Sequence, residues 1–192
     1  MGLIAEKRRI AISAIEDLLE DHKLIMQMVG LIDISVEKAE KGAPPSAGVM
    51  SSELEFCRDF VSKWHETKEE QVLMPALSKI GYPSDRGPIW QTIEDHRKGR
   101  SIIRRWAAAE KTTKEDQKLK DFLEYASAYS MYLYEHIKEE ERGLYRAAQL
   151  AIPPEMQEDI SKSSIAMDKE LSEEGGRERY SKIIDRLKKE LG

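Results

Sequence analysis

The chain contains four histidines, and the sequence around each of them is suited to binding a metal ion: His22, His65, His96 and His136. Two of the four are followed four positions later by a glutamate, Glu69 and Glu140. A lone histidine followed by a His-x-x-x-Glu pair therefore occurs twice, and the two occurrences are about 72 residues apart, as in an internal repeat. A mixed set of imidazoles and carboxylates suits iron, manganese or zinc better than calcium or magnesium.

A helix would bring the two members of each His-x-x-x-Glu pair to the same face, since residues four apart are offset by only about 40° around the helix and about 6 Å along its axis. Burying one ionised carboxylate is costly, and two in one core also repel each other. Two cations shared by both carboxylates remove both costs. A single histidine on an apolar face is more often a hydrogen-bonded core residue. The occurrence of the whole set on inward faces favours a dinuclear metal site.

The rest of the sequence indicates the helices that would position these residues. β-branched alternation is essentially absent, so no strands are expected. Pro44-Pro45, Gly81 and Pro153-Pro154 interrupt the helical pattern, Pro88 suits a first helical turn, and Thr113 is the expected N-cap of the fourth helix. We predict four long helices and, on either side of Gly175-Gly176, two weaker ones: residues 6–40, 52–80, 88–110, 113–150, 155–171 and 177–191.

Four long helices with short connections predict an all-α, antiparallel, up-and-down four-helix bundle. His22 falls in the middle of the apolar stripe of the first helix, between Leu18 and Ile25. The other three histidines and both glutamates also fall on apolar faces, so all six side chains should point into the bundle. We expect a bundle domain over residues 1–152 and a C-terminal helical extension, residues 153–192, packed on it.

Composition narrows the class of protein. Charged residues make up 35% of the chain and the formal net charge is -5, which argues against nucleic acid or an anionic membrane as a partner. No apolar run approaches the roughly 20 residues of a membrane span, and the first residues do not resemble a secretory signal. Cys57 is the only cysteine, which fits a buried small residue in a reducing compartment. We therefore expect a cytoplasmic protein.

Two stretches of the sequence carry a resemblance to a known family. Residues 60–77, which include His65-Glu66-Thr67-Lys68-Glu69-Glu70, and residues 87–100, which include Glu94-Asp95-His96, resemble signatures of the hemerythrin family in its HHE cation-binding branch. The resemblance spans about residues 13–150. It implies a four-helix bundle that holds two iron ions in a non-haem di-iron centre with an oxo or hydroxo bridge. Carried over by position, the ligands are six, with the two glutamates as bridges: His22, His65, Glu69, His96, His136 and Glu140.

The sequence departs from the oxygen-carrying hemerythrins at one ligand. Those proteins have a fifth histidine four residues from the ligand of the third helix, whereas here Thr92 and Arg100 flank His96 at that spacing. The departure puts reversible oxygen carriage in doubt. We expect a protein that binds or reacts with oxygen, peroxide or nitric oxide, in sensing or in oxidative or nitrosative stress defence. The alternatives are a catalase-like or nitric oxide-reducing enzyme, or a non-catalytic iron buffer or sensor, so enzymatic activity stays open.

Four further residues near the predicted ligands have two interpretations each. Glu66 can supply an extra carboxylate ligand or be a solvated or outer-sphere acid, and the latter is favoured. Tyr132 can approach the metals or simply pack, and packing is favoured. Asp21 and Asp95 each precede a ligand histidine. They can orient the ligands from outside the coordination sphere or be solvated helix acids, which is the favoured interpretation.

Overall fold

The computed structural model describes the backbone of residues 2–171 and 176–192, and the side chains of residues 14–169 and 176–192. Within these ranges every regular element is a helix, so the all-helical prediction is confirmed. The first long helix, α1 (Gly2–Glu40), ends at the predicted residue. The third, α5 (Gly87–Ala109), begins with Pro88 in its first turn, as expected. Gly175 lies outside the described residues.

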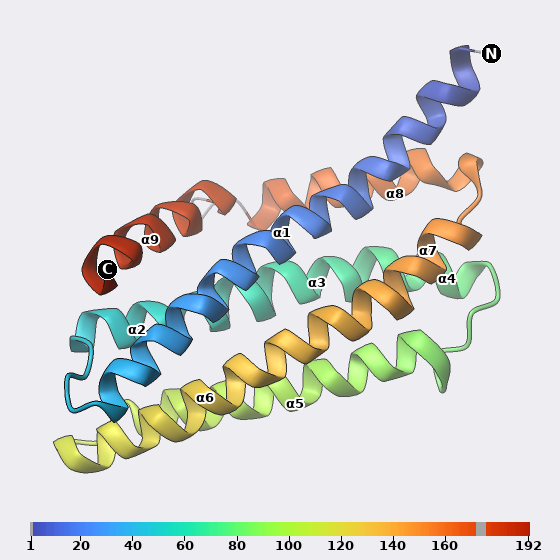
Figure 1. Ribbon diagram of the computed structural model, residues 1–192. Helices are drawn as coiled ribbons and strands as arrows, with labels where there is room; N and C mark the ends of the chain where they lie inside the picture. Colours follow the sequence, from blue (N-terminus) through green and yellow to red (C-terminus); the bar gives the residue numbers. More distant parts are fainter. Residues whose placement is uncertain (1, 172–175) are drawn as a thin grey trace.

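The second and fourth long helical runs are continuous but change their winding along the way. The second run is composed of α2 (Ala47–Glu55), η1 (Phe56–His65), α3 (Glu66–Lys68), η2 (Glu69–Leu73) and α4 (Met74–Lys79). The fourth is composed of α6 (Glu115–Glu140), η3 (Glu141–Tyr145) and α7 (Arg146–Ala151). The three η segments are π-helical. The four runs lie side by side and alternate in direction along the chain (Figure 1).

Local sequence explains where the runs begin and end. Ser46 caps α2, because its Oγ accepts a hydrogen bond from the Val49 backbone N–H at 3.2 Å. The second run therefore starts five residues before the predicted position 52. Gly42, with a φ of 79°, follows α1 in the left-handed conformation that ends many helices. The predicted cap at Thr113 is wrong: Lys114 occupies the N-cap position and makes no side-chain capping hydrogen bond.

The interior consists of two apolar clusters with a polar layer between them. One cluster is built around Ile25, Phe60 and Trp106, and the other around Leu18, Leu77 and Leu144. On every long run the predicted ligand lies between residues of the two clusters, as His22 does between Leu18 and Ile25. Cys57 is fully buried in the first cluster, as expected. The helices thus bring the polar residues together at one level of the interior.

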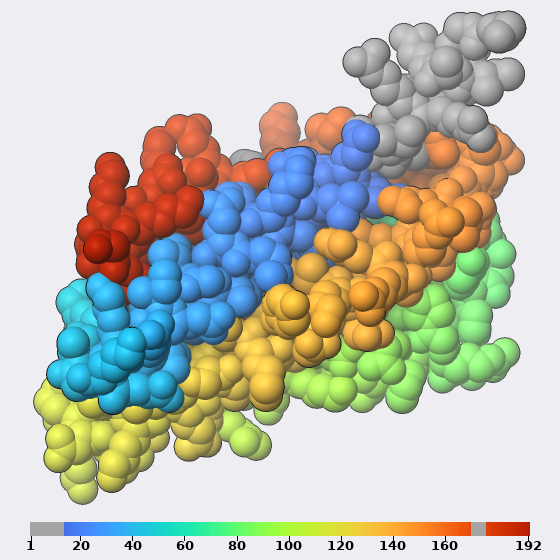
Figure 2. All heavy atoms as spheres, viewed as in Figure 1, coloured from blue at the N-terminus to red at the C-terminus, as the bar shows by residue number. Residues whose placement is uncertain are grey.

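Two further helices lie outside the four runs. α8 (Pro154–Leu171) contacts α1 and η2, and α9 (Gly176–Leu191) contacts α1, α2 and η1. α9 buries Tyr180, Ile184 and Leu187 in the first apolar cluster. Figure 2 shows α9 beside α1, and α1 beside α6, over one face of the molecule. Within the described residues no helix is long and apolar enough to cross a membrane.

A buried acid far from the histidines should make stability depend on pH. Burial raises the pKa of Glu53 to about 8 from an ordinary value of 4.5, against the opposing effect of the Ser35 hydroxyl, which donates to it at 2.5 Å. The folded state therefore holds a proton that the unfolded chain releases. We expect metal-free protein to lose about 1.4 kcal/mol of unfolding free energy per pH unit from this group between about pH 4.5 and 8.

Urea denaturation of metal-free Glu53→Gln and of the unsubstituted protein, at pH 5 and pH 8, measures this effect. The amide cannot ionise, so the variant should gain stability over the unsubstituted protein as the pH rises. Glu124→Gln, at an exposed position of α6, is the control and should follow the unsubstituted protein. Parallel pH profiles for all three proteins would show that Glu53 does not hold the proton.

Candidate metal centre

All six predicted ligand side chains are buried and meet in the polar layer between the two apolar clusters. In the first group, Nε2 of His22 lies 3.1 Å from Nε2 of His65 and 3.3 Å from Glu140 Oε2. Nε2 of His65 lies 3.5 Å from Glu69 Oε1. The potential ligand atoms of these four residues all lie within 4.8 Å of one another. Such a cluster has the dimensions and the donor types of a metal site.

The second group shares its carboxylates with the first. Nε2 of His96 lies 3.3 Å from Glu69 Oε2 and 3.8 Å from Glu140 Oε1. Nε2 of His136 lies 3.6 Å from Glu140 Oε2. Glu69 therefore contacts His65 through one oxygen and His96 through the other, and Glu140 also contacts histidines of both groups. Each glutamate has the placement of a carboxylate that bridges two cations.

The π-helical segments coincide with the ligands. η1 ends at His65, η2 begins at Glu69, and η3 begins directly after Glu140. π-helical turns are rare and occur frequently at functional sites, because the extra residue in the turn shifts the side chains that follow it. The 3.6-residue α-helical repeat, on which the prediction from sequence was based, does not predict these shifts in side-chain direction. α1 and α5 supply His22 and His96 from regular α-helical turns.

Burial and mutual repulsion distribute protons unevenly over the six side chains. Burial and the neighbouring Glu69 raise the pKa of Glu140 to about 8. Burial opposes ionisation of Glu69 as well, but His65, His96 and His22 hold its pKa well below the usual range. Burial would lower the pKa of His22, but Glu140 and Glu141 raise it to about 9. In the metal-free site, protons on Glu140 and His22 therefore offset the negative charge of the two glutamates. Bound cations would displace these protons.

Several atoms of the site have no hydrogen-bond partner among the described residues. They are Glu69 Oε2, His96 Nε2, His136 Nε2 and both carboxylate oxygens of Glu140. A buried polar atom without a partner costs about 1–3 kcal/mol, and more when it is charged. These atoms all face the centre of the polar layer, where two cations would satisfy them. The residues present therefore fit a pair of metal ions.

Three of the histidines contact a carboxylate through the other ring nitrogen. Nδ1 of His22 lies 3.0 Å from Glu141, Nδ1 of His96 lies 2.7 Å from Glu70, and Nδ1 of His65 lies 3.5 Å from Asp21. Such outer carboxylates fix the tautomer and the orientation of ligand imidazoles. The sequence pattern did not predict this role for Glu70 and Glu141, although each directly follows a predicted bridging glutamate.

The two aspartates next to ligand histidines have different roles. Asp21 is fully buried, so the interpretation as a solvated acid is wrong. It contacts His65 of the neighbouring helix and not His22, which follows it in the sequence. Burial would raise the pKa of Asp21, but His65, Lys68 and Arg177 lower it to about 2. Asp95 is half-buried and is paired with residues of its own helix: Lys98, at 2.8 Å, and Gln91, from which it accepts a hydrogen bond.

Tyr145 is a residue of the site that the sequence pattern did not predict. Its hydroxyl donates to Glu69 Oε1 at 2.5 Å and lies 3.2 Å from Nε2 of His22. Its ring stacks on the His22 ring at 5.0 Å. Tyr145 is five positions after Glu140, and only the π-helical winding of η3 turns residues at that spacing toward the same side. The polar layer thus contains a phenol in addition to the six predicted side chains.

The favoured interpretation is wrong in part for Glu66 and agrees with the structure for Tyr132. Glu66 is fully buried, so the interpretation as a solvated acid is wrong. Its Oε2 accepts a hydrogen bond from Nε of Arg100 at 2.8 Å, and it belongs to a third group with Glu70 and His96. Tyr132 packs, as expected: its ring stacks on His136 at 5.3 Å and lies where a Cβ at Gly99 would clash.

A cleft of about 510 Å³ reaches this polar layer from the surface. His136, Glu140 and Thr92 line its inner part, and Pro88, Trp90 and Leu144 are among its other walls. Thr92 is one of the two positions at which a fifth histidine would stand, and its side chain is much smaller than an imidazole. The cleft therefore gives a small molecule a route to two of the predicted ligands.

One of three comparisons with known proteins gave a match. Neither a search of the curated proteins nor a search of the solved structures gave a match. The model of one protein family, the hemerythrin HHE cation-binding domain, matches residues 13–148. That span begins in α1 and ends in α7, so it includes every predicted ligand and most of the chain. The chain belongs to the hemerythrin HHE cation-binding domain family.

Proposed function

We propose that the protein is a non-haem di-iron protein that binds or reacts with a small ligand, namely oxygen, peroxide or nitric oxide. The observation that carries the proposal is the polar layer in which two carboxylates each contact histidines on both sides. We infer that the four long runs form a hemerythrin-type up-and-down bundle, residues 1–152. Residues 153–192 are then a helical extension.

The six side chains would divide between two iron ions. His22 and His65 would hold one ion, His96 and His136 the other, and Glu69 and Glu140 would bridge them. When bound, two irons would supply electrons and open coordination positions for the ligand. Asp21, Glu70 and Glu141 orient the imidazoles, and the apolar clusters on both sides limit the access of water. The cleft beside Thr92 admits the ligand.

The test of the proposal is a metal analysis combined with an oxygen cycle. We expect two irons per chain after anaerobic loading with ferrous iron. Because no fifth histidine protects the irons, exposure to oxygen should oxidise them essentially irreversibly. The absorption spectrum is recorded before exposure, after exposure, and after oxygen is removed under argon. One metal or none per chain would contradict the di-iron proposal. Full recovery of the ferrous spectrum over repeated cycles would instead indicate an oxygen carrier.

Tyr145 should affect the reaction more than the binding of metal. Its phenol donates a hydrogen bond to Glu69. Tyr145 is not one of the six predicted ligands, so the binding of iron by Glu69 does not require it. We expect Tyr145→Phe to keep the iron content of the unsubstituted protein while changing the rate at which the iron-loaded protein reacts with peroxide. Stopped-flow absorption measures that rate. Tyr134→Phe, at an exposed tyrosine of α6, is the control. Equal rates in all three proteins would remove Tyr145 from the reaction.

The enzyme alternative differs from stoichiometric binding in turnover. A catalase-like protein releases many equivalents of oxygen from peroxide per chain, whereas a sensor or a binding protein reacts about once. An oxygen electrode with excess peroxide distinguishes the two. The buried phenol next to the predicted bridge is the feature that favours reaction over simple binding.

A further inference from the structure

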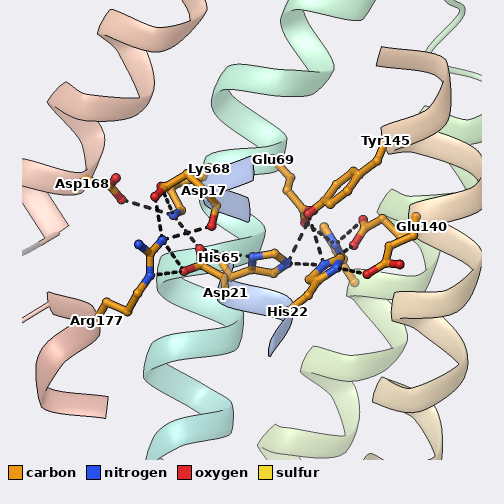
Figure 3. A network of polar contacts seen from close by, with 12 residues as sticks. Asp17, Asp21, His22, His65, Lys68, Glu69, Glu140, Tyr145, Asp168 and Arg177 are labelled. Atoms are coloured by element: carbon orange, nitrogen blue, oxygen red, sulfur yellow. Dashed lines mark hydrogen bonds and ion pairs between the residues drawn. The ribbon is translucent and has the colours of Figure 1, made fainter. Parts of the chain in front are cut away.

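A second charge cluster, with a buried centre and a partly exposed rim, lies directly outside the predicted metal centre. It consists of three carboxylates and two cations: Asp17, Asp21, Asp168, Lys68 and Arg177. Lys68 is only 1% exposed, and its ammonium lies 2.6 Å from Asp21, 3.2 Å from Asp168 and 3.3 Å from Asp17. Figure 3 shows this cluster on one side of His65, with His22, Glu69, Glu140 and Tyr145 on the other. Of these five residues, the proposed function uses only Asp21.

The cluster joins the C-terminal helices to the centre. Asp168 comes from α8 and Arg177 from α9, whereas the other three members belong to α1 and α3. The Arg177 guanidinium donates through Nε to Asp21 Oδ1 at 2.8 Å, and its Nη2 lies 2.7 Å from the same oxygen. Nη2 also donates to the Asp17 backbone carbonyl at 3.1 Å. A planar guanidinium held at several points fixes its partner more firmly than an ammonium does.

Asp21 passes this constraint to a predicted ligand. Its Oδ1 is held by Arg177 from α9, and its Oδ2 contacts Lys68 and lies 3.5 Å from Nδ1 of His65. An imidazole that binds metal through Nε2 carries its proton on Nδ1, where an oriented carboxylate accepts it. Asp21 is the carboxylate that faces this nitrogen. Three carboxylates against two cations also leave the cluster with one net negative charge beside the ligand.

Resting on the proposed function, we propose that Arg177 is a positioning residue of the metal centre. Through Asp21 it holds the imidazole of His65 in the orientation that binds metal, and it thereby couples the docking of α9 to metal binding. Because coupling between two sites is reciprocal, bound metal should stabilise the docked α9 by the same factor by which α9 improves metal affinity. The C-terminal extension then responds to metal occupancy.

The loss of Arg177 should leave α9 in place, which makes the proposal testable. α9 is also held by buried Tyr180, Ile184 and Leu187, and Arg186 donates from Nη2 to the Ser52 hydroxyl at 2.6 Å. Arg186 thus ties α9 to α2, away from the cluster beside His65. Arg186→Gln is therefore a matched control for Arg177→Gln. Both substitutions remove the guanidinium of one arginine of the same helix, but only Arg177→Gln releases Asp21 Oδ1.

The experiment titrates the full-length protein with cobalt(II), whose visible absorption reports the ligand geometry, in competition with a chelator. We expect Arg177→Gln to weaken cobalt affinity about tenfold and to alter the visible bands, as substitutions of outer-sphere partners do. Arg177→Lys should recover part of the affinity. Arg186→Gln should keep the affinity and spectrum of the unsubstituted protein. Hydrogen exchange of the α9 amides should slow on metal binding in the unsubstituted protein and in Arg186→Gln, but not in Arg177→Gln.

Two results would overturn the coupling while leaving the proposed function intact. One is unchanged cobalt affinity in Arg177→Gln. The other is an equal loss in Arg177→Gln and Arg186→Gln, which would mean that any weakening of α9 docking disturbs the site. Failure of the unsubstituted protein to bind cobalt or iron would instead remove the proposed function itself, and the coupling with it.

Discussion

Replacing Glu140 by glutamine is expected to abolish binding of both metal ions. Glu140 lies within 3.3–3.8 Å of His22, His96 and His136, so its carboxylate belongs to both ligand groups. The amide has the same shape but one neutral oxygen ligand, and it cannot bridge two cations. Iron content measured after anaerobic loading should fall from two per chain toward none. His22→Ala removes one terminal ligand only and should retain a weakened site.

The same variant separates a role in binding from a role in folding. Burial and Glu69 raise the pKa of Glu140, so its carboxyl is a costly group to ionise in the metal-free fold. We therefore expect metal-free Glu140→Gln to be at least as stable to urea as the unsubstituted protein at pH 9. Glu135→Gln, exposed on the same helix, is the control for metal content. Retention of as much iron by Glu140→Gln as by His22→Ala would contradict the bridging assignment.

Removing the metal is expected to lower the melting temperature by about 10 °C. Metal that binds only the folded chain at about 1,000 times its dissociation constant adds about 4 kcal/mol, and 1 kcal/mol corresponds to about 2–4 °C in a chain of this size. The metal-free site keeps Glu69 and Glu140 buried side by side, and several of its atoms lack hydrogen bonds. The physical cause of the loss is that the metal-free fold must hold two neighbouring buried carboxylates with protons and imidazoles in place of two cations.

Circular dichroism melts of chelator-treated protein, with and without added ferrous iron under argon, measure this shift. Metal-loaded and metal-free Glu140→Gln should melt at one temperature, since that variant binds no metal. Identical melting temperatures for the unsubstituted protein with and without iron would show that the buried carboxylates are compensated in some other way.

The sequence alone determined which side chains each helix buries and what kind of elements carry them. Four histidines and two His-x-x-x-Glu pairs on apolar helical faces were sufficient to predict the six buried side chains of the polar layer. The family was predicted separately, from the resemblance of residues 60–77 and 87–100 to its signatures. The reason is local. The 3.6-residue repeat places a ligand on the buried face of its own helix, and prolines and glycines limit where each helix can run.

Only the tertiary structure decided which helix faces which, and at what height. Asp21 neighbours His22 in the chain but contacts His65, because helix packing sets the rotation and axial offset between α1 and the second run. The contact of Arg177 with Asp21 has the same origin, since it joins residues 156 positions apart. Tyr145 reaches Glu69 through the π-helical winding of η3, which an α-helical repeat does not describe. Periodicity fixes a face of one helix, whereas contacts between helices depend on packing that no single helix encodes.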